Sequence, residues 1–299
     1  MTPHLSVVVM AHGRSPRLLS CLQSVQRQLT ALPYEILVVL NPADGDIRSP
    51  ADLAGVRWVE LRERLHPGEA RNAGWTAAEG EIVAFLMANC TALPGWLDAL
   101  ADEHRRRPEH PVGGPVRLPD NARIVETAAY FCELAAPPVP DTGRYADDWP
   151  ICNLSYPRRL LEAAGGFPAT AGGSDRELHE RLRANGVRIW VSPRPAVTYH
   201  PIDNVGDLLG HEFRAGRLYG DLRASREGLS RRGRALRALA WWILPGVFAL
   251  RGLKQTRDDM RTRLLFLRSV HILLLGWTAR ALGDATGLLH GPARVEGTA

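Results

Sequence analysis

Two stretches of the sequence carry side chains that could do chemistry. Asp175 follows two glycines and opens a predicted helix. A carboxylate there can take a proton from a hydroxyl group or cap the helix, and the two roles are compatible. Arg71 lies in the segment GEARNAG, and its guanidinium can form charge-assisted hydrogen bonds to phosphate oxygens. A surface salt bridge from Arg71 to Glu69 or Glu79 is the alternative.

The elements around Arg71 predict where a ligand would bind. The segment is expected to be a helix stopped by Gly80, because glycine readily takes the left-handed conformation of a helix C-terminus. Residues 81–86, EIVAFL, form an apolar run too short for a helix and typical of a buried parallel strand. Residues 87–90, MANC, follow at its carboxyl end. Open α/β sheets bind ligands at this edge, so Asn89 is a candidate binding residue.

Short apolar runs alternate with helical patterns along the first two thirds of the chain. Strands are expected over residues 5–10, 34–40, 56–61 and 186–191. A helix is expected over residues 15–28, with leucines and valine at helical spacing. This alternation predicts an α/β fold with a mostly parallel central sheet. The proline-rich stretch between residues 101 and 150 is expected to be mainly loop.

The order of these pieces resembles the inverting family 2 glycosyltransferases, which have a Rossmann-like, nucleotide-sugar-binding fold. GEARNAG, a helix, GEIVAFL, a polar tetrad and PGWL follow one another, and the acidic helix start at residue 174 comes later. The resemblance implies a glycosyltransferase-like domain over residues 1–205 and a helical tail over residues 206–299.

The resemblance also implies a divalent metal, Mn²⁺ or Mg²⁺, held by an Asp-rich triplet after the fourth strand. This chain has Met87, Ala88 and Asn89 at those positions. Hard cations prefer several oxygen ligands, and Asn89 with His200 does not provide them. We therefore predict no metal site.

Site residues carry over from the family by position. Asp175 corresponds to the catalytic base, the second member of an acidic pair whose first member is Ser174 here. His200 is either a donor to phosphate or a packed structural histidine. The residues implied in donor binding are Ala11, His12, Arg14, Asn41, Arg71, Asn72, Asn89, His200, Arg214 and Arg217.

The tail is both basic and apolar. Eight arginines lie between Arg214 and Arg237, and the apolar run 238–250 follows. That run is shorter than the roughly 20 residues needed to span a bilayer. Tryptophans beside a basic segment suit a membrane interface, so we expect peripheral contact with a membrane. Packing against the catalytic domain or a second copy, and a spanning hairpin, are the alternatives.

Composition sets broader limits. The chain is 45% hydrophobic and 23% charged, typical of a globular protein, with a net charge of +5. Its four cysteines form no metal-ligand pattern. The amino terminus lacks the pattern of a signal peptide, so we expect a cytoplasmic protein on the inner face of the cell membrane. The basic tail has no motif that reads nucleic acid.

Together these features predict a glycosyltransferase that moves a sugar from a nucleotide-diphosphate donor to an acceptor hydroxyl, which a lipid carrier could present, with inversion. Positive side chains would offset the charge of the leaving diphosphate in place of a metal. The alternative is a catalytically silent relative that binds a nucleotide or partner and scaffolds glycan assembly. Leu40, Met87, Ala88 and Ser174, all at usually acidic positions, motivate that alternative.

Overall fold

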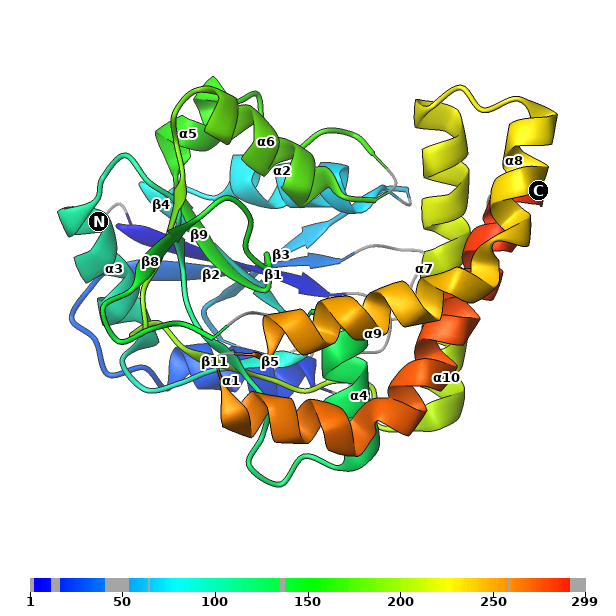
Figure 1. The fold of residues 1–299 in the computed structure, drawn as a ribbon. Helices are drawn as coiled ribbons and strands as arrows, with labels where there is room; N and C mark the ends of the chain where they lie inside the picture. Colours follow the sequence, from blue (N-terminus) through cyan, green and yellow to red (C-terminus); the bar gives the residue numbers. More distant parts are fainter. Residues whose placement is uncertain are drawn as a thin grey trace. The chain divides into compact units, whose positions relative to one another are not determined.

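The computed structural model describes residues 3–11, 17–40, 54–63, 65–134, 138–170, 172–257 and 259–290. By internal contacts the chain forms two compact units (Figure 1). The first comprises residues 1–119 and 138–200, and the second comprises residues 120–137 and 201–299. The functional boundary expected after residue 205 stays a prediction.

The elements of the first unit alternate in the expected way. Its strands are β1 (Leu5–Ala11), β2 (Tyr34–Leu40), β3 (Val56–Glu60), β4 (Ile82–Met87), β5 (Cys90–Ala92), β6 (Val112–Gly113), β7 (Val116–Arg117), β8 (Arg144–Ala146), β9 (Asn153–Pro157), β10 (Ile189–Val191) and β11 (Val197–Tyr199). Its helices are α1 (Leu18–Gln26), α2 (Pro67–Ala77), α3 (Trp96–Arg106), α5 (Arg158–Ala163) and α6 (Ser174–Ala184).

The main sheet has the strand order β3-β2-β1-β4-β9-β6-β10-β8. Strands β3, β2, β1 and β4 pair in parallel, whereas β9 runs antiparallel to β4 and β6, and β8 runs antiparallel to β10. Helices α2, α5 and α6 lie on one side of this sheet and α1 on the other (Figure 1). Strand β1 is buried along its whole length, as a strand covered on both faces should be. The predicted mostly parallel α/β fold is confirmed.

A smaller sheet has the order β5-β11-β7. Its antiparallel register places Tyr199 opposite Cys90. The residues on either side of that pair, Asn89 and His200, are therefore neighbours, and the His200 backbone N–H donates to the Asn89 carbonyl at 2.8 Å.

Helix α2 lies unusually close to the main sheet. A Cβ atom on Gly74 would come within 2.5 Å of a Val8 methyl group, so only glycine permits this packing. The predicted helix cap at Gly80 is wrong, because α2 ends at Ala77 and Gly80 has no positive φ. Gly80 is required instead by its contact with Ser6, whose backbone nitrogen would lie 2.7 Å from an added Cβ.

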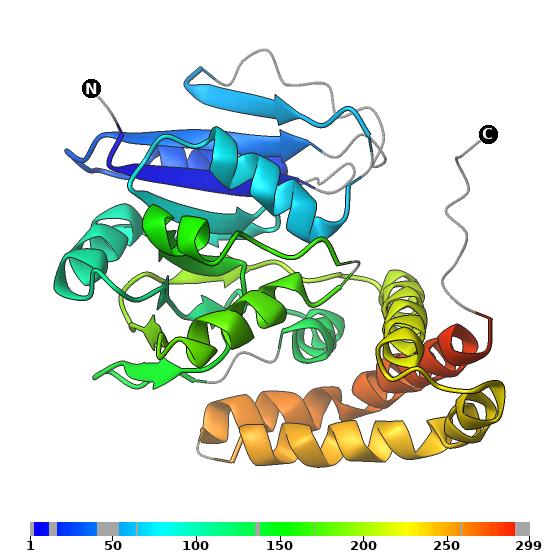
Figure 2. The same ribbon diagram turned by 90° about the horizontal axis from the view of Figure 1, so that it is seen from above.

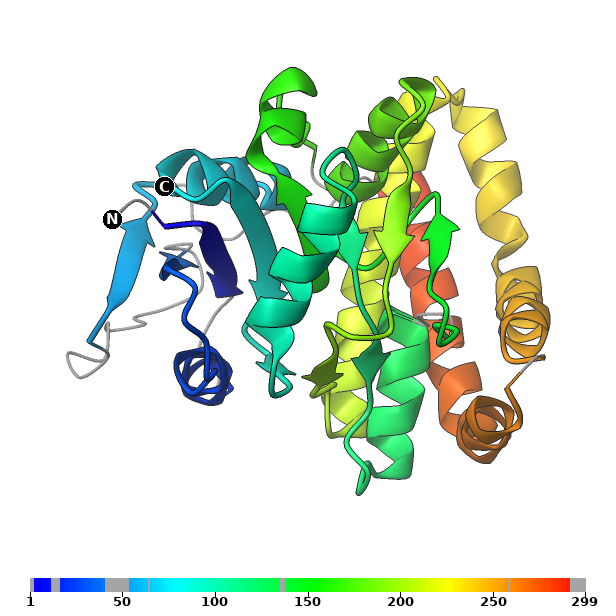
Figure 3. The ribbon, with the colours of Figure 1, turned by 90° about the vertical axis from the view of Figure 1, so that its left-hand side faces the viewer.

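The second unit is helical. It consists of α4 (Ile124–Glu133), α7 (Val205–Arg226), α8 (Arg231–Leu239), the 3₁₀ turn η2 (Trp241–Ile243), α9 (Leu244–Gln255) and α10 (Met260–His290). Helices α9 and α10 run side by side (Figure 2), and α7 lies along α10 (Figure 3). Helix α4 also packs on α10, with the rings of Phe131 and Phe266 centred 5.3 Å apart.

Glycines and buried ion pairs join α7 to α10. A Cβ on Gly216 would lie 2.0 Å from the Arg280 carbonyl oxygen, so the two backbones nearly touch there. Arg280 forms two hydrogen bonds, of 2.6 and 3.1 Å, with the fully buried carboxylate of Glu212. The face of α7 that carries Glu212 and Gly216 is therefore packed against α10 within the second unit.

Replacing Gly216 with alanine should separate α7 from α10. We expect a loss of about 1–3 kcal/mol in the free energy of unfolding, because the added methyl group overpacks the contact. Urea unfolding followed by circular dichroism measures it. Gly246→Ala is the matched control, since nothing lies within 4 Å of a Cβ at that helical position, and alanine there should stabilise by about 0.5–1 kcal/mol. Equal stability of the two variants would refute the close contact.

Candidate active site

The two stretches singled out in the sequence meet in the fold. Arg71 on α2 donates a hydrogen bond from Nη1 to Ser174 Oγ at 2.9 Å, at the start of α6. A Cβ on Gly68 would lie 2.2 Å from the Pro168 carbonyl oxygen, which explains how α2 approaches this segment so closely. The Arg71 guanidinium also lies over the Phe167 ring, 5.7 Å from its centre. Arg71 is thus held in place from two sides.

The two glutamates considered as salt-bridge partners of Arg71 have other contacts. Glu69 accepts a hydrogen bond from the His66 backbone, and Glu79 pairs with Arg57. Arg71 also lines a small cavity with Met10, at the carboxyl end of β1, and Met87, at the end of β4. It therefore lies at the sheet edge where a ligand was expected.

Asp175 lies in the first turn of α6 and is partly buried. The N-cap residue of this helix is Gly173, which has φ of 72° and makes no side-chain cap hydrogen bond. Asp175 is therefore not the cap residue, although the positive end of the helix dipole favours its charge. Burial raises the pKa of the Tyr156 phenol; the charge of Asp175 raises it further and that of Arg71 opposes it. The carboxylate and the guanidinium thus both act on one buried phenol.

A hydrogen-bonded chain behind Asp175 was not predicted from the sequence. The Tyr156 hydroxyl lies 2.7 Å from His179 Nε2, and His179 Nδ1 lies 2.7 Å from Asp148 Oδ1. An ionised carboxylate can only accept, so His179 Nδ1 donates its hydrogen to Asp148. His179 lies one helical turn after Asp175 and is 2% exposed. The chain therefore fixes the orientation of the α6 face that holds the carboxylate.

This hydrogen-bonded chain affects the pKa of the Asp148 carboxyl. Burial alone would raise the pKa of its carboxyl, but the hydrogen bond from His179 and the charges of His179 and Arg176 bring that pKa below its usual value. Arg176 Nε lies 3.6 Å from the second carboxylate oxygen. The sequence contains one sign of this hydrogen-bonded chain. His179 follows Leu178, which lies on the buried face of the helix.

Asn72 joins α2 to the segment before α6. Its Nδ2 donates to the Phe167 carbonyl at 2.8 Å, and its Oδ1 accepts from the Phe167 N–H at 2.8 Å and from Trp75 Nε1 at 2.9 Å. Gly166 has φ of 72°, and a Cβ there would lie 2.6 Å from Asn72 Oδ1. Asn72 thus has a clear structural role, and its role in donor binding stays a prediction.

Asn89 and His200 form a second polar group at this edge. His200 Nε2 lies 3.2 Å from Thr91 Oγ1, and Asn89 Oδ1 is buried with no hydrogen-bond partner in the described part of the chain. Among the residues that the structure describes, no three His, Cys, Asp or Glu side chains cluster as a metal site would require. One amide oxygen, a hydroxyl and an imidazole do not fit a hard divalent cation.

The remaining predicted donor-binding residues belong to different parts of the chain. Ala11 ends β1 and is buried. Arg214 and Arg217 lie on α7 of the second unit. His12, Arg14 and Asn41 lie outside the described residues. The structure brings together Arg71 with Ser174 and Asn89 with His200, as two contacts on the first unit.

Asp148→Asn should lower the free energy of unfolding near pH 7 by about 1 kcal/mol. This value is kept small because the Asp148 carboxylate is half exposed to solvent. The folded-state pKa lies below the unfolded value of about 3.9, so the ionised group stabilises the fold above that value. Its contribution disappears as the pH falls through the folded pKa. The difference between variant and wild type should therefore shrink toward pH 3, as urea unfolding at several pH values would measure.

Asp147→Asn is the control for this experiment. Asp147 is half exposed and pairs with Arg188 at 2.8 Å, and exposed pairs contribute little. If Asp148→Asn proved no less stable than Asp147→Asn near pH 7, the stabilising role of the chain would be wrong.

Comparison of the sequence with known proteins finds glycosyltransferases. Residues 6–128 match the model of glycosyl transferase family 2. The glycosyltransferase AglE of Haloferax volcanii is 25% identical over 301 residues, which cover 95% of this chain and 94% of that protein. The validoxylamine A glucosyltransferase of Streptomyces hygroscopicus subsp. jinggangensis is 28% identical over 228 residues, covering 64% of this chain and 54% of that protein.

Solved structures share the fold. The mannosyltransferase PcManGT from Pyrobaculum calidifontis, in complex with GDP-Man and Mn²⁺, superposes with a TM-score of 0.57 at 18% identity, covering 94% of this chain and 86% of its own. Residues 1–349 of S. aureus TarS, in complex with UDP-GlcNAc, give a TM-score of 0.50 at 13% identity, covering 90% and 89%.

Proposed function

Since the chain is a family 2 glycosyltransferase, we propose that it moves a sugar from a nucleotide-diphosphate donor to an acceptor hydroxyl, with inversion at the anomeric carbon. The observation that carries this proposal is the contact of Arg71 with Ser174, one residue before Asp175. It brings a fixed guanidinium to the helical turn that carries Asp175, at the strand-end edge of the first unit. A base and a group that binds phosphate are the two requirements of such a transfer.

Asp175 acts as the base. It accepts the proton of the acceptor hydroxyl while the hydroxyl oxygen bonds to the anomeric carbon. The bond from that carbon to the diphosphate oxygen breaks in the same step, and its electron pair leaves with the diphosphate. Attack opposite the leaving group inverts the configuration.

Arg71 offsets the charge of the departing diphosphate. Preorganised positive groups stabilise charge that develops in a transition state, and guanidinium groups suit phosphate geometry. His200 and the Asn89 amide are further candidates for contact with the donor, and the donor-binding role expected of Arg214 and Arg217 stays a prediction. No step is assigned to a metal, because the described oxygen ligands do not fit one.

Asp175→Asn should abolish most of the transfer activity, by about 10²–10⁴-fold in kcat, because the amide cannot accept the proton. Donor affinity should change by less than about threefold. Calorimetry with UDP-GlcNAc and GDP-Man, the donors of the solved relatives, identifies the nucleotide. Product formation with the donor that binds then gives the rate.

Glu177→Gln is the matched control, since Glu177 lies in the same helical turn and pairs with Arg181. It should keep nearly full activity, and EDTA should not lower the rate of the wild type. An undiminished rate in Asp175→Asn would remove Asp175 as the base. A protein that binds no nucleotide sugar at all would favour the silent scaffold instead.

We propose further that the second unit binds the cytoplasmic face of a membrane. Two stretches, Arg231–Gln255 and Met260–His290, are long and apolar enough to cross a bilayer by length and composition, which alone is weak support. Only 11% and 33% of their most apolar windows are buried. The large apolar side chains exposed along them are Leu236, Leu239, Trp242, Ile243, Leu250, Leu253, Met260, Leu264, Leu267, Leu274, Leu275, Leu282 and Leu289.

The charges beside this apolar surface favour anionic lipid. Arg231 and Arg232 are exposed at the start of α8, and each such basic group contributes about 1 kcal/mol near an anionic surface. Trp242, 67% exposed, follows in η2, and tryptophan favours the headgroup region. A lipid-linked acceptor would be presented at the same surface.

Flotation with vesicles tests this proposal. The protein should bind phosphatidylglycerol-containing vesicles more tightly than phosphatidylcholine vesicles, and binding should weaken with salt. Leu239→Ser with Trp242→Ser should reduce binding at least about tenfold, because two apolar side chains lose their burial in lipid. Leu29→Ser is the control, since Leu29 is 94% exposed on the first unit.

Three results would contradict peripheral binding. Resistance to alkaline carbonate extraction would indicate a spanning segment. Self-association without lipid, abolished in the double variant, would indicate a dimer interface. Failure to bind either vesicle type would leave the apolar surface to another partner.

A further inference from the structure

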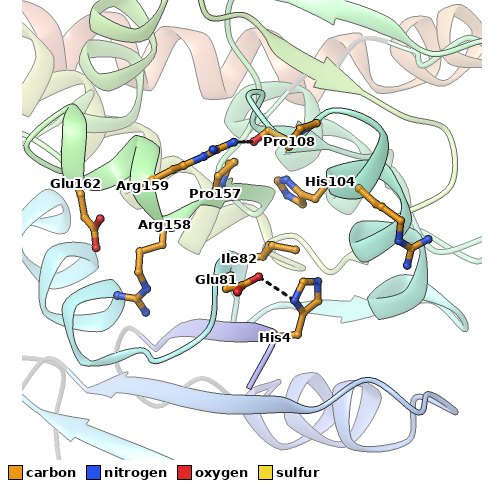
Figure 4. Close-up of a pocket in the computed structure, with 10 residues that line it drawn as sticks. His4, Glu81, Ile82, His104, Pro108, Pro157, Arg158, Arg159 and Glu162 are labelled. Atoms are coloured by element: carbon orange, nitrogen blue, oxygen red, sulfur yellow. Dashed lines mark hydrogen bonds and ion pairs between the residues drawn. The ribbon is translucent and has the colours of Figure 1, made fainter. Parts of the chain in front are cut away.

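Two cavities are lined by residues outside the candidate active site. The larger, of about 450 Å³, lies in the first unit beside the starts of β1 and β4 (Figure 4). Its charged side chains are of both signs, and several are already paired. Glu81 lies 3.3 Å from His4 Nδ1, and Arg159 donates to the Pro108 carbonyl. Because both signs of charge are present, this cavity does not favour one class of ligand.

The smaller cavity belongs to the second unit and has a volume of about 160 Å³. Residues of α4, α9 and α10 form it, and its aromatic lining residues are Phe131, Phe248, Phe266 and Trp277. The Phe131 and Phe266 rings are centred 5.3 Å apart. The centre of a Trp277 ring lies 6.1 Å from the centres of the Phe266 and Phe248 rings. The rings therefore make one continuous apolar wall.

A fixed guanidinium adjoins this wall. Arg280 lines the cavity, and its Nε and Nη2 donate to the Glu212 carboxylate at 2.6 and 3.1 Å. Its Nη1 makes no hydrogen bond to another residue in the part of the chain that the structure describes. The side chain keeps 22% of its surface exposed. Arg280 is therefore a donor whose orientation is already set, which reduces the entropy lost when a ligand binds.

Arg251 gives the cavity a net positive charge. It is exposed on α9, one turn before Gln255, which also lines the cavity. Arg251 forms no ion pair with another residue that the structure describes. None of the described lining residues is acidic. Burial raises the pKa of the Cys132 thiol, so that thiol stays neutral. An anionic group is therefore favoured in this cavity, and a cation is not.

The cavity is too small to hold a whole ligand. Sites that enclose a drug-sized molecule have about 300–1,000 Å³. A ligand that uses both the rings and the guanidinium groups must therefore extend beyond the cavity. The same helices expose leucines for such an extension: Leu250 and Leu253 on α9 are 69% and 37% exposed, and Leu274 on α10 is 42% exposed. The rest of an apolar chain thus has a surface on which to lie.

These features distinguish between ligand classes. A cation would meet two arginines. A small inorganic anion would make no use of the rings, and a neutral hydrocarbon would make none of the guanidinium groups. A phosphate group that carries an apolar chain uses both, since guanidinium suits phosphate geometry and the chain is buried against the rings. We propose that this cavity binds the head of an anionic lipid, with its phosphate at Arg251 and Arg280 and the first carbons of its chain against the rings.

Two kinds of lipid have this chemistry: a glycerophospholipid of the bilayer and an isoprenyl phosphate. The inference rests on the proposed binding to a membrane for the supply of either lipid. Soluble short-chain lipids test the cavity without a membrane, so the two proposals fail separately. Absence of vesicle binding alone would contradict the membrane proposal, and absence of soluble-lipid binding alone would contradict this one.

Calorimetric titration of the full chain tests the cavity. The probes are dihexanoylphosphatidylglycerol and geranyl phosphate, each below its critical micelle concentration. At least one should bind with a Kd of about 1 mM or lower, and the tighter of the two identifies the source of the lipid. Inorganic phosphate and geraniol should each bind at least about tenfold more weakly, because each lacks one half of the proposed contact. UDP should not displace the lipid, since no residue of this cavity belongs to the proposed donor site.

Arg251→Gln should weaken lipid binding about fivefold or more, because a charge-assisted contact with the phosphate is lost. Arg268→Gln is the matched control. Arg268 is also exposed, and it lies about 200° around α10 from the cavity-lining Phe266, so its substitution should leave lipid binding unchanged.

Phe248→Ala tests the apolar half of the contact. With its fold checked by circular dichroism, this variant should bind the lipid about threefold or more weakly, because the chain loses part of its apolar wall. Its affinity for inorganic phosphate should be unchanged, since phosphate does not use the ring. Arg280 is unsuitable for substitution, because the fully buried Glu212 would lose its partner.

Four outcomes would overturn the proposal. Neither lipid binds the wild type, or geraniol binds as tightly as geranyl phosphate, which would make the cavity a purely apolar site. Inorganic phosphate that binds as tightly as the lipids would make it an anion site. Equal binding by the wild type and Arg251→Gln, or displacement of the lipid by UDP, would place the lipid elsewhere on the protein.

Discussion

The close packing of α2 positions the active-site side chains. Its two glycines let the helix backbone touch β1 at Gly74 and the segment before α6 at Gly68. Any side chain at either place would push the helix outward and carry Arg71 away from Ser174. Asn72 then fastens the same helix to Phe167 with both ends of its amide. The guanidinium is placed by backbone contacts and needs no flexible loop, which is the preorganisation that electrostatic catalysis requires.

The polar edge of the sheet carries few negative charges. Leu40, Met87, Ala88 and Ser174 are neutral, and Asp175 is the carboxylate that remains among the compared positions. Among the described residues no cluster of carboxylates is available to hold a cation there. The guanidinium can meet a diphosphate directly. Behind it, Tyr156, His179 and Asp148 are hydrogen-bonded to one another, so a paired polar chain supports the helix that holds the proposed base.

The sequence predicted what depends on local pattern. The parallel strands and their alternation with the helices followed from short apolar runs. The contact of Arg71 with the start of α6 was not predicted, because it depends on tertiary packing. Helix α4 was missed because prolines surround a single short amphipathic segment. The chain from Tyr156 to Asp148 was missed because its members come from three elements and meet only through tertiary packing. The left-handed cap at Gly80 was wrong, since a steric contact with Ser6 requires glycine there.

Helix α4 interrupts the α/β unit in sequence but belongs to the helical one. Its buried face, with Phe131 against Phe266, is covered by α10, the last helix that the structure describes. A nascent chain therefore exposes this face until more than a hundred further residues have been synthesised. A fragment cut after His200 would keep α4 and lose its cover. Such a fragment would be prone to aggregate, so the α/β unit is a poor candidate for production alone.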